Sequence, residues 1–201
     1  MPKSVTGLAA PLPLANVDTD VIMPKRFLIT ITREGLAEGT FADLRFDEAG
    51  NIRPEFVLNK APWKNASILI VGDNFGCGSS REHAVWGMGQ MGLTAAIGTG
   101  FAGIFYDNAR KNGLVLPIVT PEARDAMLDL AAAGDGLEIS IDIENRNIIA
   151  GEMSVPFEMD DATQASIIRG GDDTLDSLEH AEAIRAFEAK LGDKMRVSVL
   201  K

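Results

Sequence analysis

Residues 67–133 alternate short apolar runs with segments of helical pattern, and this alternation restricts the fold more than any other feature of the chain. Short continuous apolar runs are typical of strands buried on both faces of a parallel sheet. Strands that alternate with helices favour parallel strands joined by right-handed crossovers. We therefore expect an α/β fold with a central parallel sheet. The expected strands are 67–71, 93–97 and 114–119, and the expected helices are 80–91, 102–111 and 121–133.

The segments outside this alternation complete a single domain, which we expect to span residues 1–201. Residues 1–15 carry several prolines, so they are expected to form an edge strand or an extended arm. Residues 25–62 form a long connection with turn signals, which favours a loop or lid near a functional site. The pattern also predicts a β-hairpin over 137–150 and a helix over 175–192 that packs by one face.

Composition excludes several classes of function. The net charge is −10 and the basic residues are scattered, so neither nucleic acid nor an anionic membrane is an expected partner. The single cysteine, Cys77, forms no internal disulfide and cannot hold a metal ion alone, and no metal site is expected. The chain shows no signal-peptide pattern and no apolar run of membrane-spanning length, so we expect a cytoplasmic protein.

Residues 72–84 (GDNFGCGSSREHA) form the most distinctive motif, because they link an expected strand to an expected helix. Their three glycines allow backbone angles closed to other residues. Ser79 and Ser80 fall where a helix N-cap is expected, and Arg81 follows them. The free amides of the first helical turn, the helix dipole and a guanidinium would then surround one small volume. This arrangement predicts an anion site.

Residues 16–24 (NVDTDVIMP) allow two interpretations. Two carboxylates flank a hydroxyl, and a solvated turn whose aspartates bond their own backbone accounts for this pattern. Alternatively, the segment is a polar finger that reaches into the anion site. Spacing alone favours the turn.

Residues 98–103 (GTGFAG) match the G-x-G-x-x-G fingerprint of a dinucleotide site between a strand and a helix. The match starts halfway along the chain, which leaves room for only one mononucleotide-binding half. A tight strand-to-helix turn accounts for the same glycines and is the favoured interpretation. A dinucleotide-binding module stays as the alternative from another class.

The motif at residues 72–84, together with residues 18–24, resembles the small subunits of 3-isopropylmalate dehydratase, a family similar to the swivelling domain of aconitase. Further likeness lies in residues 53–59 (RPEFVLN), 99–105 (TGFAGIF) and 112–114 (NGL). The resemblance implies a three-layer swivelling β/β/α domain, like domain 4 of aconitase. It also assigns residues 98–103 to a structural turn.

The resemblance implies a division of labour between two chains. A large subunit would hold a [4Fe–4S] cluster through its own cysteines, and this chain, with one cysteine, would bind no cofactor. The substrate would be a small dicarboxylate. The reaction would isomerise 2-isopropylmalate to 3-isopropylmalate by dehydration and rehydration, in leucine biosynthesis.

By the same resemblance, three residues of the motif are catalytic. Ser79 would act as the base in its alkoxide form, which the helix start and the neighbouring guanidinium would stabilise. Ser80 would donate a hydrogen bond. Arg81 would bind a substrate carboxylate through a two-pronged contact.

Three further residues are expected to contact or orient the substrate. Thr19 and Asp20 match the polar finger of the family and would orient groups of the site. Arg33, in the long connection, would contact a second carboxylate and sense the side chain of the substrate.

The sequence departs from the family pattern at two places. Val85 stands where family members usually carry proline, and residues 161–173 replace a basic stretch. These changes leave the motif intact but widen the range of substrates to other malate-type acids, such as a citraconate/methylmalate pair. A regulatory or scaffold subunit without catalysis is a further alternative.

Overall fold

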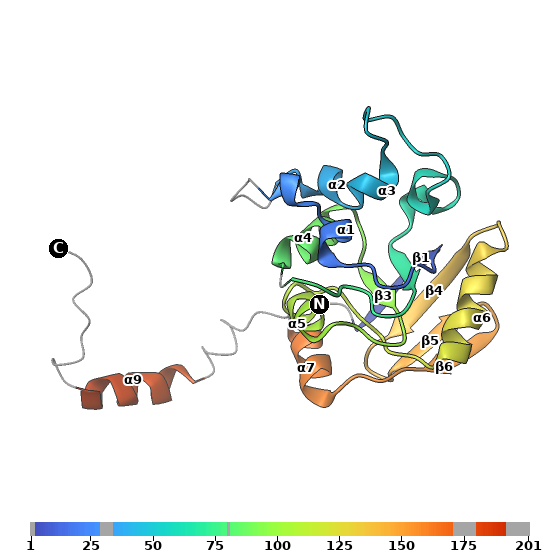
Figure 1. The fold of residues 1–201 in the computed structure, drawn as a ribbon. Coiled ribbons are helices and arrows are strands. Elements are labelled where there is room, and N and C mark those ends of the chain that lie inside the picture. The colour runs from blue at the N-terminus through green and yellow to red at the C-terminus, as the bar shows by residue number, and fades with distance from the viewer. Residues whose placement is uncertain (1–2, 29–33, 80, 171–179, 192–201) are drawn as a thin grey trace. The chain divides into compact units, whose positions relative to one another are not determined.

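The computed structural model describes residues 3–28, 34–79, 81–170 and 180–191 (Figure 1). Residues 1–171 form one compact unit, and residues 172–201 form a second. The first unit contains the whole sheet. The second contains the helix α9, Ala181–Leu191, which lies within the expected 175–192 range; residues 175–179 and 192 lie outside the described residues. A single domain over residues 1–201 therefore stays a prediction.

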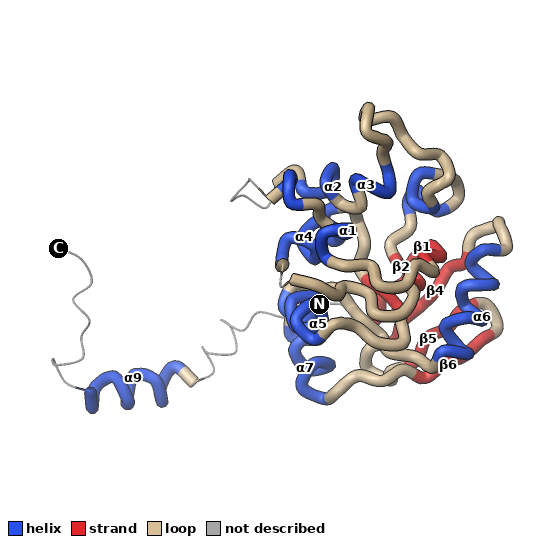
Figure 2. The backbone as a smooth tube through the Cα atoms, viewed as in Figure 1, coloured by secondary structure: helices blue, strands red, loops and turns tan. Residues whose placement is uncertain are grey.

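The first unit is built on a six-stranded mixed sheet in the order β3-β2-β1-β4-β5-β6, drawn in red in Figure 2. β1 pairs with β2 and β2 with β3 in parallel, whereas the other neighbouring pairs are antiparallel. The expected parallel strands and the expected hairpin therefore belong to one continuous sheet. Its strands are β1 (Ser4–Leu12), β2 (Ile68–Val71), β3 (Ala95–Ile97), β4 (Leu137–Asp142), β5 (Asn147–Ala150) and β6 (Met153–Pro156).

The expectation of an edge strand near the N-terminus is wrong, because β1 lies at the centre of the sheet. The pairing of β1 with β4 ends at Ala9, whereas its pairing with β2 continues to Leu12. Pro11 therefore lies in the part of β1 that has a partner on one side only, where a missing N–H is tolerated.

The strand expected over residues 114–119 is also wrong. The segment runs beside β3 but makes only isolated parallel bridges, from Val115 to Ala95 and from Ile118 to Gly98. Pro117 lies between these two bridges and has no N–H, so it cannot continue a regular ladder. β6, which extends the hairpin to a third antiparallel strand, was not predicted from the sequence.

The helices of the expected alternation are present with small shifts at their ends. α6 begins with Pro121 at its first turn, and the Thr120 hydroxyl accepts a hydrogen bond from the Ala123 amide. α7 was not predicted, although Asp160 caps it through the Thr163 amide. The longer helices of the first unit are α4 (Glu82–Gln90), α5 (Gly103–Lys111), α6 (Pro121–Ala132) and α7 (Asp161–Arg169).

The sheet separates two apolar cores, because β2 is buried on both faces. Leu69 and Val71 face the first core, which also contains apolar residues of α4 and α5. Ile68 and Ile70 face the second core, which contains residues of α6, α7 and the antiparallel strands. The continuous apolar run of β2 thus reflects helices on one face and a second packed layer on the other.

The long connection over residues 25–62 is more structured than a loop. It contains the short helices α2 (Leu36–Gly39) and α3 (Ala42–Arg45) and the 3₁₀ turns η1 (Lys25–Phe27) and η2 (Val57–Asn59). A further 3₁₀ turn, η3 (Trp63–Asn65), follows the connection. Buried apolar side chains of the connection, Leu36, Phe41 and Leu58, anchor it in the first core. At the beginning of the connection, Lys25 Nζ is 3.9 Å from Asp20 Oδ2.

Candidate active site

The site is built where two segments far apart in the sequence run side by side. The first, residues 16–20, leads into the short helix α1, Thr19–Ile22. Asp18 is the N-cap of α1, and its Oδ1 accepts a hydrogen bond from the Val21 amide at 2.8 Å. Asp18 therefore bonds the backbone as the turn interpretation expects, and it fixes the positions of Thr19 and Asp20.

The second segment is the motif loop, residues 72–81, which follows β2. Gly76 and Gly78 have φ of 77° and 89°, a left-handed conformation that glycine adopts without strain. A Cβ on Gly76 would lie 2.3 Å from the Phe105 ring, and a Cβ on Gly72 would lie 2.4 Å from the Leu14 carbonyl oxygen. Gly76 is thus required by its backbone conformation and by close packing, whereas Gly78 is required by its conformation and Gly72 by packing.

Backbone hydrogen bonds join the two segments in register. The Gly76 amide donates to the Val17 carbonyl at 2.8 Å, and the Thr19 amide donates to the Cys77 carbonyl at 2.9 Å. The buried Thr19 hydroxyl then donates to the Ser79 carbonyl at 2.9 Å. Because these bonds follow one another along both segments, α1 and the motif loop form a single rigid substructure. The turn at Asp18 is therefore present and in contact with the motif loop, and the role of this segment as a polar finger stays a prediction.

An ion pair between Arg81 and Asp20 closes this substructure. The side chain of Arg81 is 16% exposed and that of Asp20 is 40% exposed, so the pair lies at the rim of the site rather than in the core. Asp20 engages Nη1 of the guanidinium. An arginine has five N–H donors, so the remaining edge keeps donors for a second anion.

Ser79 and Arg81 lie at the end of the motif loop, but the helix begins later than expected. α4 starts at Glu82 with Arg81 in the N-cap position, so the prediction of Ser79 or Ser80 at the N-cap is wrong for Ser79. The Thr19 hydroxyl holds the Ser79 carbonyl, so Ser79 belongs to the motif loop and not to the start of the helix. Ser79 is exposed at the surface of the unit. Ser80 and Arg33 lie outside the described residues, so their expected roles stay predictions.

The beginning of the motif loop is held by a separate polar network. Asp73 Oδ1 accepts hydrogen bonds from the Thr99 hydroxyl at 2.7 Å and from Arg124 Nη1 at 2.9 Å. The pKa of Asp73 lies below its usual value, chiefly because of the Thr99 hydrogen bond and then because of Arg124. The side chain of Arg124 is 11% exposed, and its guanidinium anchors the motif loop to α6.

The second glycine-rich turn, residues 98–102, has a different environment. A Cβ on Gly98 would lie 3.0 Å from the Phe101 ring and 3.1 Å from Val71, so this glycine allows close packing. Phe101 forms a parallel bridge with Phe75 of the motif loop. The turn thus packs against the motif loop, which supports the structural interpretation of its glycines.

In the part of the chain that the structure describes, no group of three or more His, Cys, Asp or Glu side chains could hold a metal ion. Cys77 is unpaired and half-buried in the motif loop. No helix of the described residues combines the length and the apolar character that a membrane crossing needs.

Two features of the site were not predicted from the sequence. The ion pair between Arg81 and Asp20 joins residues 61 positions apart, and only the parallel course of the two segments brings them together. The Asn112 side chain, which bonds Glu82 of α4, was also missed. Its signal was present in the NGL segment at residues 112–114, which belongs to the resemblance but had no assigned role.

Comparisons with known proteins identify the family of the chain. Residues 2–123 match the family described as Aconitase C-terminal domain. The chain is 47% identical over 185 residues to the 3-isopropylmalate dehydratase small subunit of Agrobacterium fabrum, covering 92% of each chain. It is 46% identical to the protein of the same name from Jannaschia sp., covering 93% of this chain and 94% of that protein.

A solved structure shows the same fold. The crystal structure of 3-isopropylmalate dehydratase (leuD) from Methanocaldococcus jannaschii superposes with a TM-score of 0.66 and 28% sequence identity. The match covers 92% of this chain and 99% of that chain. The expected swivelling α/β architecture of the aconitase type is thereby confirmed. The chain belongs to the family of 3-isopropylmalate dehydratase small subunits, within the Aconitase C-terminal domain family.

Proposed function

We propose that the chain is the small subunit of a heteromeric hydro-lyase that converts 2-isopropylmalate to 3-isopropylmalate in leucine biosynthesis. The family relationship supports this function, since relatives named 3-isopropylmalate dehydratase small subunit are 46–47% identical over more than nine-tenths of the chain. The observation that carries the proposal is the rigid pairing of α1 with the motif loop. It presents an exposed serine and an oriented arginine together at one rim.

Ser79 is the proposed base. The reaction removes a proton from the carbon next to a carboxylate, and the neighbouring carbon loses its hydroxyl group. That group leaves as water with a second proton from an acid on the large subunit, and the same acid takes a proton back when water adds. In the return step, water adds across the double bond with the opposite regiochemistry. Ser79 Oγ takes the proton in the first step and returns it in the second. A serine hydroxyl is a weak acid, so its alkoxide needs nearby positive charge, and Arg81 lies two residues away.

Arg81 is the proposed carboxylate clamp. Asp20 holds one nitrogen of its guanidinium and thereby limits the rotamers of a long side chain. Arg81 therefore loses less conformational entropy when it binds a substrate carboxylate. Thr19 acts through the backbone. Its hydroxyl holds the Ser79 carbonyl and so fixes the direction in which the Ser79 side chain projects from the loop.

The large subunit completes the site. Ser79 is exposed, as the proposal requires of a base that faces a second polypeptide. We propose that the large subunit carries a [4Fe–4S] cluster, which supplies Lewis-acid chemistry at the departing hydroxyl group. The described residues of this chain offer no alternative metal site. The unpaired Cys77 is compatible with the reducing cytoplasm, where we place the enzyme.

The decisive experiment is anaerobic co-expression with a 3-isopropylmalate dehydratase large subunit, followed by an assay of isopropylmaleate hydration. We expect activity only when both chains are present. Arg81→Lys keeps the charge but loses the planar two-pronged contact, so kcat/KM should fall about thirtyfold, equivalent to roughly 2 kcal/mol. Ser154→Ala, an exposed serine on β6, is the matched control and should leave kcat/KM unchanged. Full activity of this chain alone would overturn the proposal.

The same assay decides between diacid substrates. Isopropylmaleate and the shorter citraconate are compared at equal concentrations, because citraconate is the substrate of the alternative function. The substitution at Val85 affects the core rather than the rim, since this side chain is 2% exposed within α4. Residues 161–169 of the other departure form α7, whose Ile167 packs in the second core. We therefore expect isopropylmaleate to have the higher kcat/KM.

A further inference from the structure

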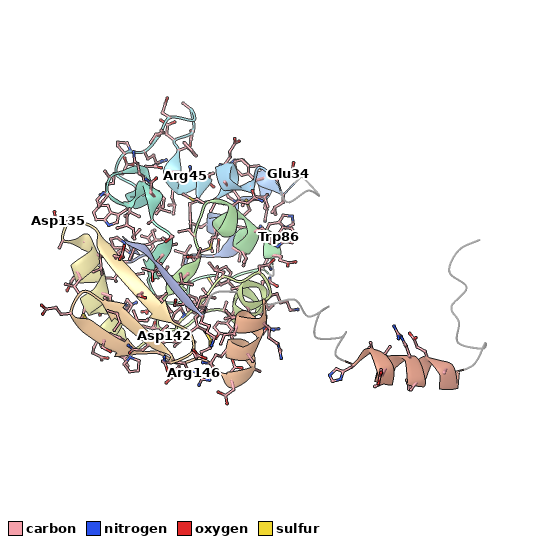
Figure 3. All side chains as sticks on the ribbon, turned by 180° about the vertical axis from the view of Figure 1, so that it is seen from behind. Glu34, Arg45, Trp86, Asp135, Asp142 and Arg146 are labelled. Atoms are coloured by element: carbon pink, nitrogen blue, oxygen red, sulfur yellow. The ribbon has the colours of Figure 1, made fainter. Side chains whose placement is uncertain are left out.

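The side chain of Asn112 connects the start of α4 to the end of α5. Asn112 is the C-cap residue of α5. Its Nδ2 donates to Glu82 Oε1 at 2.9 Å and to the Asn108 carbonyl at 2.9 Å. Its Oδ1 accepts a hydrogen bond from Trp86 Nε1 at 2.9 Å. Trp86 is labelled on α4 in Figure 3. One amide thus bonds two residues of α4 and one turn of α5.

The chemistry of the partners determines how this amide is oriented. An indole N–H only donates, so Trp86 must face the amide oxygen. An ionised carboxylate only accepts, so Glu82 must face the amide nitrogen. Among side chains of this size, only asparagine presents one acceptor and one donor at these two positions. The network therefore depends on the residue type and not only on packing.

The position of Glu82 makes this network relevant to the site. Glu82 is the first residue of α4 and follows Arg81 directly. An anionic substrate at the start of this helix is favoured by the free amides and the helix dipole. A carboxylate of the same turn, if released from Asn112, would compete for that position and for the Arg81 guanidinium. Its charge would also repel a dianionic substrate.

We propose that Asn112 is a positioning residue of the enzyme. It holds the Glu82 carboxylate against the end of α5 and fixes the first turn of α4, which keeps Arg81 available for the substrate carboxylate. This inference rests on the proposed function, because it assigns a role to Arg81 in substrate binding. It extends the functional unit from the motif loop to the NGL segment that follows α5.

A polarity swap tests the proposal in the assembled two-chain enzyme. Asn112→Asp places two carboxylates against each other, so we expect KM for isopropylmaleate to rise about tenfold, with kcat within about threefold of wild type. Glu82→Gln alone keeps the bond, since its amide oxygen accepts from Asn112, and KM should stay within about threefold. The double variant Glu82→Gln/Asn112→Asp rebuilds the bond between residues 82 and 112 in reverse. The bond to the Asn108 carbonyl stays lost in both variants that carry Asn112→Asp, so their difference reports the contact with residue 82. Its KM should return to within about threefold of wild type.

Controls separate positioning from general destabilisation. Asn147→Asp makes the same chemical change on β5, where the side chain bonds Ser154, and it should leave KM unchanged. Thermal melting of each variant identifies any loss of folded protein at the assay temperature. An unchanged KM in Asn112→Asp, or no recovery in the double variant, would overturn the inference while leaving the proposed function intact. An inactive wild-type complex would instead overturn the proposed function.

Discussion

Residues 72–81 and 98–102 each lead from a parallel strand of the sheet into a helix, and both are rich in glycine. In the motif loop, Gly76 and Gly78 adopt the left-handed conformation. In the second turn, all of whose residues the structure describes, no φ lies between +20° and +160°. The motif loop is thus shaped by glycine conformation, whereas the second turn uses glycine for packing at Gly98 and leaves Gly100 in open space.

The two turns also differ in what they present to solvent. The motif loop ends with the exposed Ser79 and with Arg81 at the rim. In the second turn, Phe101 packs against Gly98, and the Thr99 hydroxyl donates a hydrogen bond to Asp73. A glycine-rich strand-to-helix turn therefore forms a candidate active site in one case and a structural support for that site in the other. Each of the following predictions tests one part of this contrast.

The largest expected effect concerns the hydroxyl groups of the two turns. Ser79→Ala removes the proposed base, so kcat of the two-chain enzyme should fall about 10³-fold, within the range of general acid–base catalysis. Thr99→Ala removes a hydroxyl that only supports Asp73, and its kcat should change less than about threefold. The measurement is the initial rate of isopropylmaleate hydration at saturating substrate. Equal losses in both variants would refute the contrast between the turns.

The glycines should differ in their effect on stability. Gly76→Ala combines a left-handed φ with a Cβ 2.3 Å from the buried Phe105 ring, so it should lower the free energy of unfolding by about 3 kcal/mol. Gly100→Ala places its methyl group in open space, and the change should stay within about 0.5 kcal/mol. Urea denaturation of the isolated chain measures both values. A Gly100 variant as unstable as the Gly76 variant would contradict the packing difference.

Two arginine–aspartate pairs hold the two ends of the motif loop, and the pairs should have different roles. Asp20→Asn removes the charge that orients Arg81, so KM for the diacid should rise about tenfold. Asp73→Asn weakens the anchor to α6 at the far end of the loop and should change KM less than about threefold. Steady-state kinetics of the two variants side by side check this prediction. A larger KM change in the Asp73 variant would mean that the anchor, not the rim pair, controls substrate binding.

The local elements of the fold were predictable where the apolar periodicity and the residues that end helices and strands agreed. β2, α5 and α6 were predicted within about two residues because apolar runs, glycines and Pro121 mark their ends. The central position of β1 was not predicted, since prolines usually indicate an edge. Only the register shows that Pro11 lies beyond the end of the β4 pairing. The strand predicted over residues 114–119 was wrong for the opposite reason. There the apolar run favoured a strand, although Pro117 within it prevents a regular ladder.

The candidate site was predictable in its residue types but not in its contacts. The motif itself indicated Ser79 and Arg81, and the resemblance added Thr19 and Asp20. The start of α4 was misplaced, because two serines before an acidic residue have the pattern of an N-cap. In the structure, the Thr19 hydroxyl holds the Ser79 carbonyl, and the helix begins only at Glu82. A contact between residues 60 positions apart leaves no periodic signal in either segment.

The smallest expected effect is the pH dependence that the Asp73 network confers on stability. The folded-state pKa of Asp73 lies below the ordinary value for an aspartate, so its contribution to stability is present above the unfolded-state pKa and is lost as the pH falls through the folded-state pKa. Wild type should therefore melt at a higher temperature than Asp73→Asn near pH 7, and the difference should shrink below about pH 4. Thermal melting in buffers between these values checks the trend. Because the Thr99 hydroxyl is the largest cause of the shift, a Thr99→Val background should reduce the pH-dependent difference. A difference that stays constant with pH would show that Asp73 contributes through packing rather than through its charge.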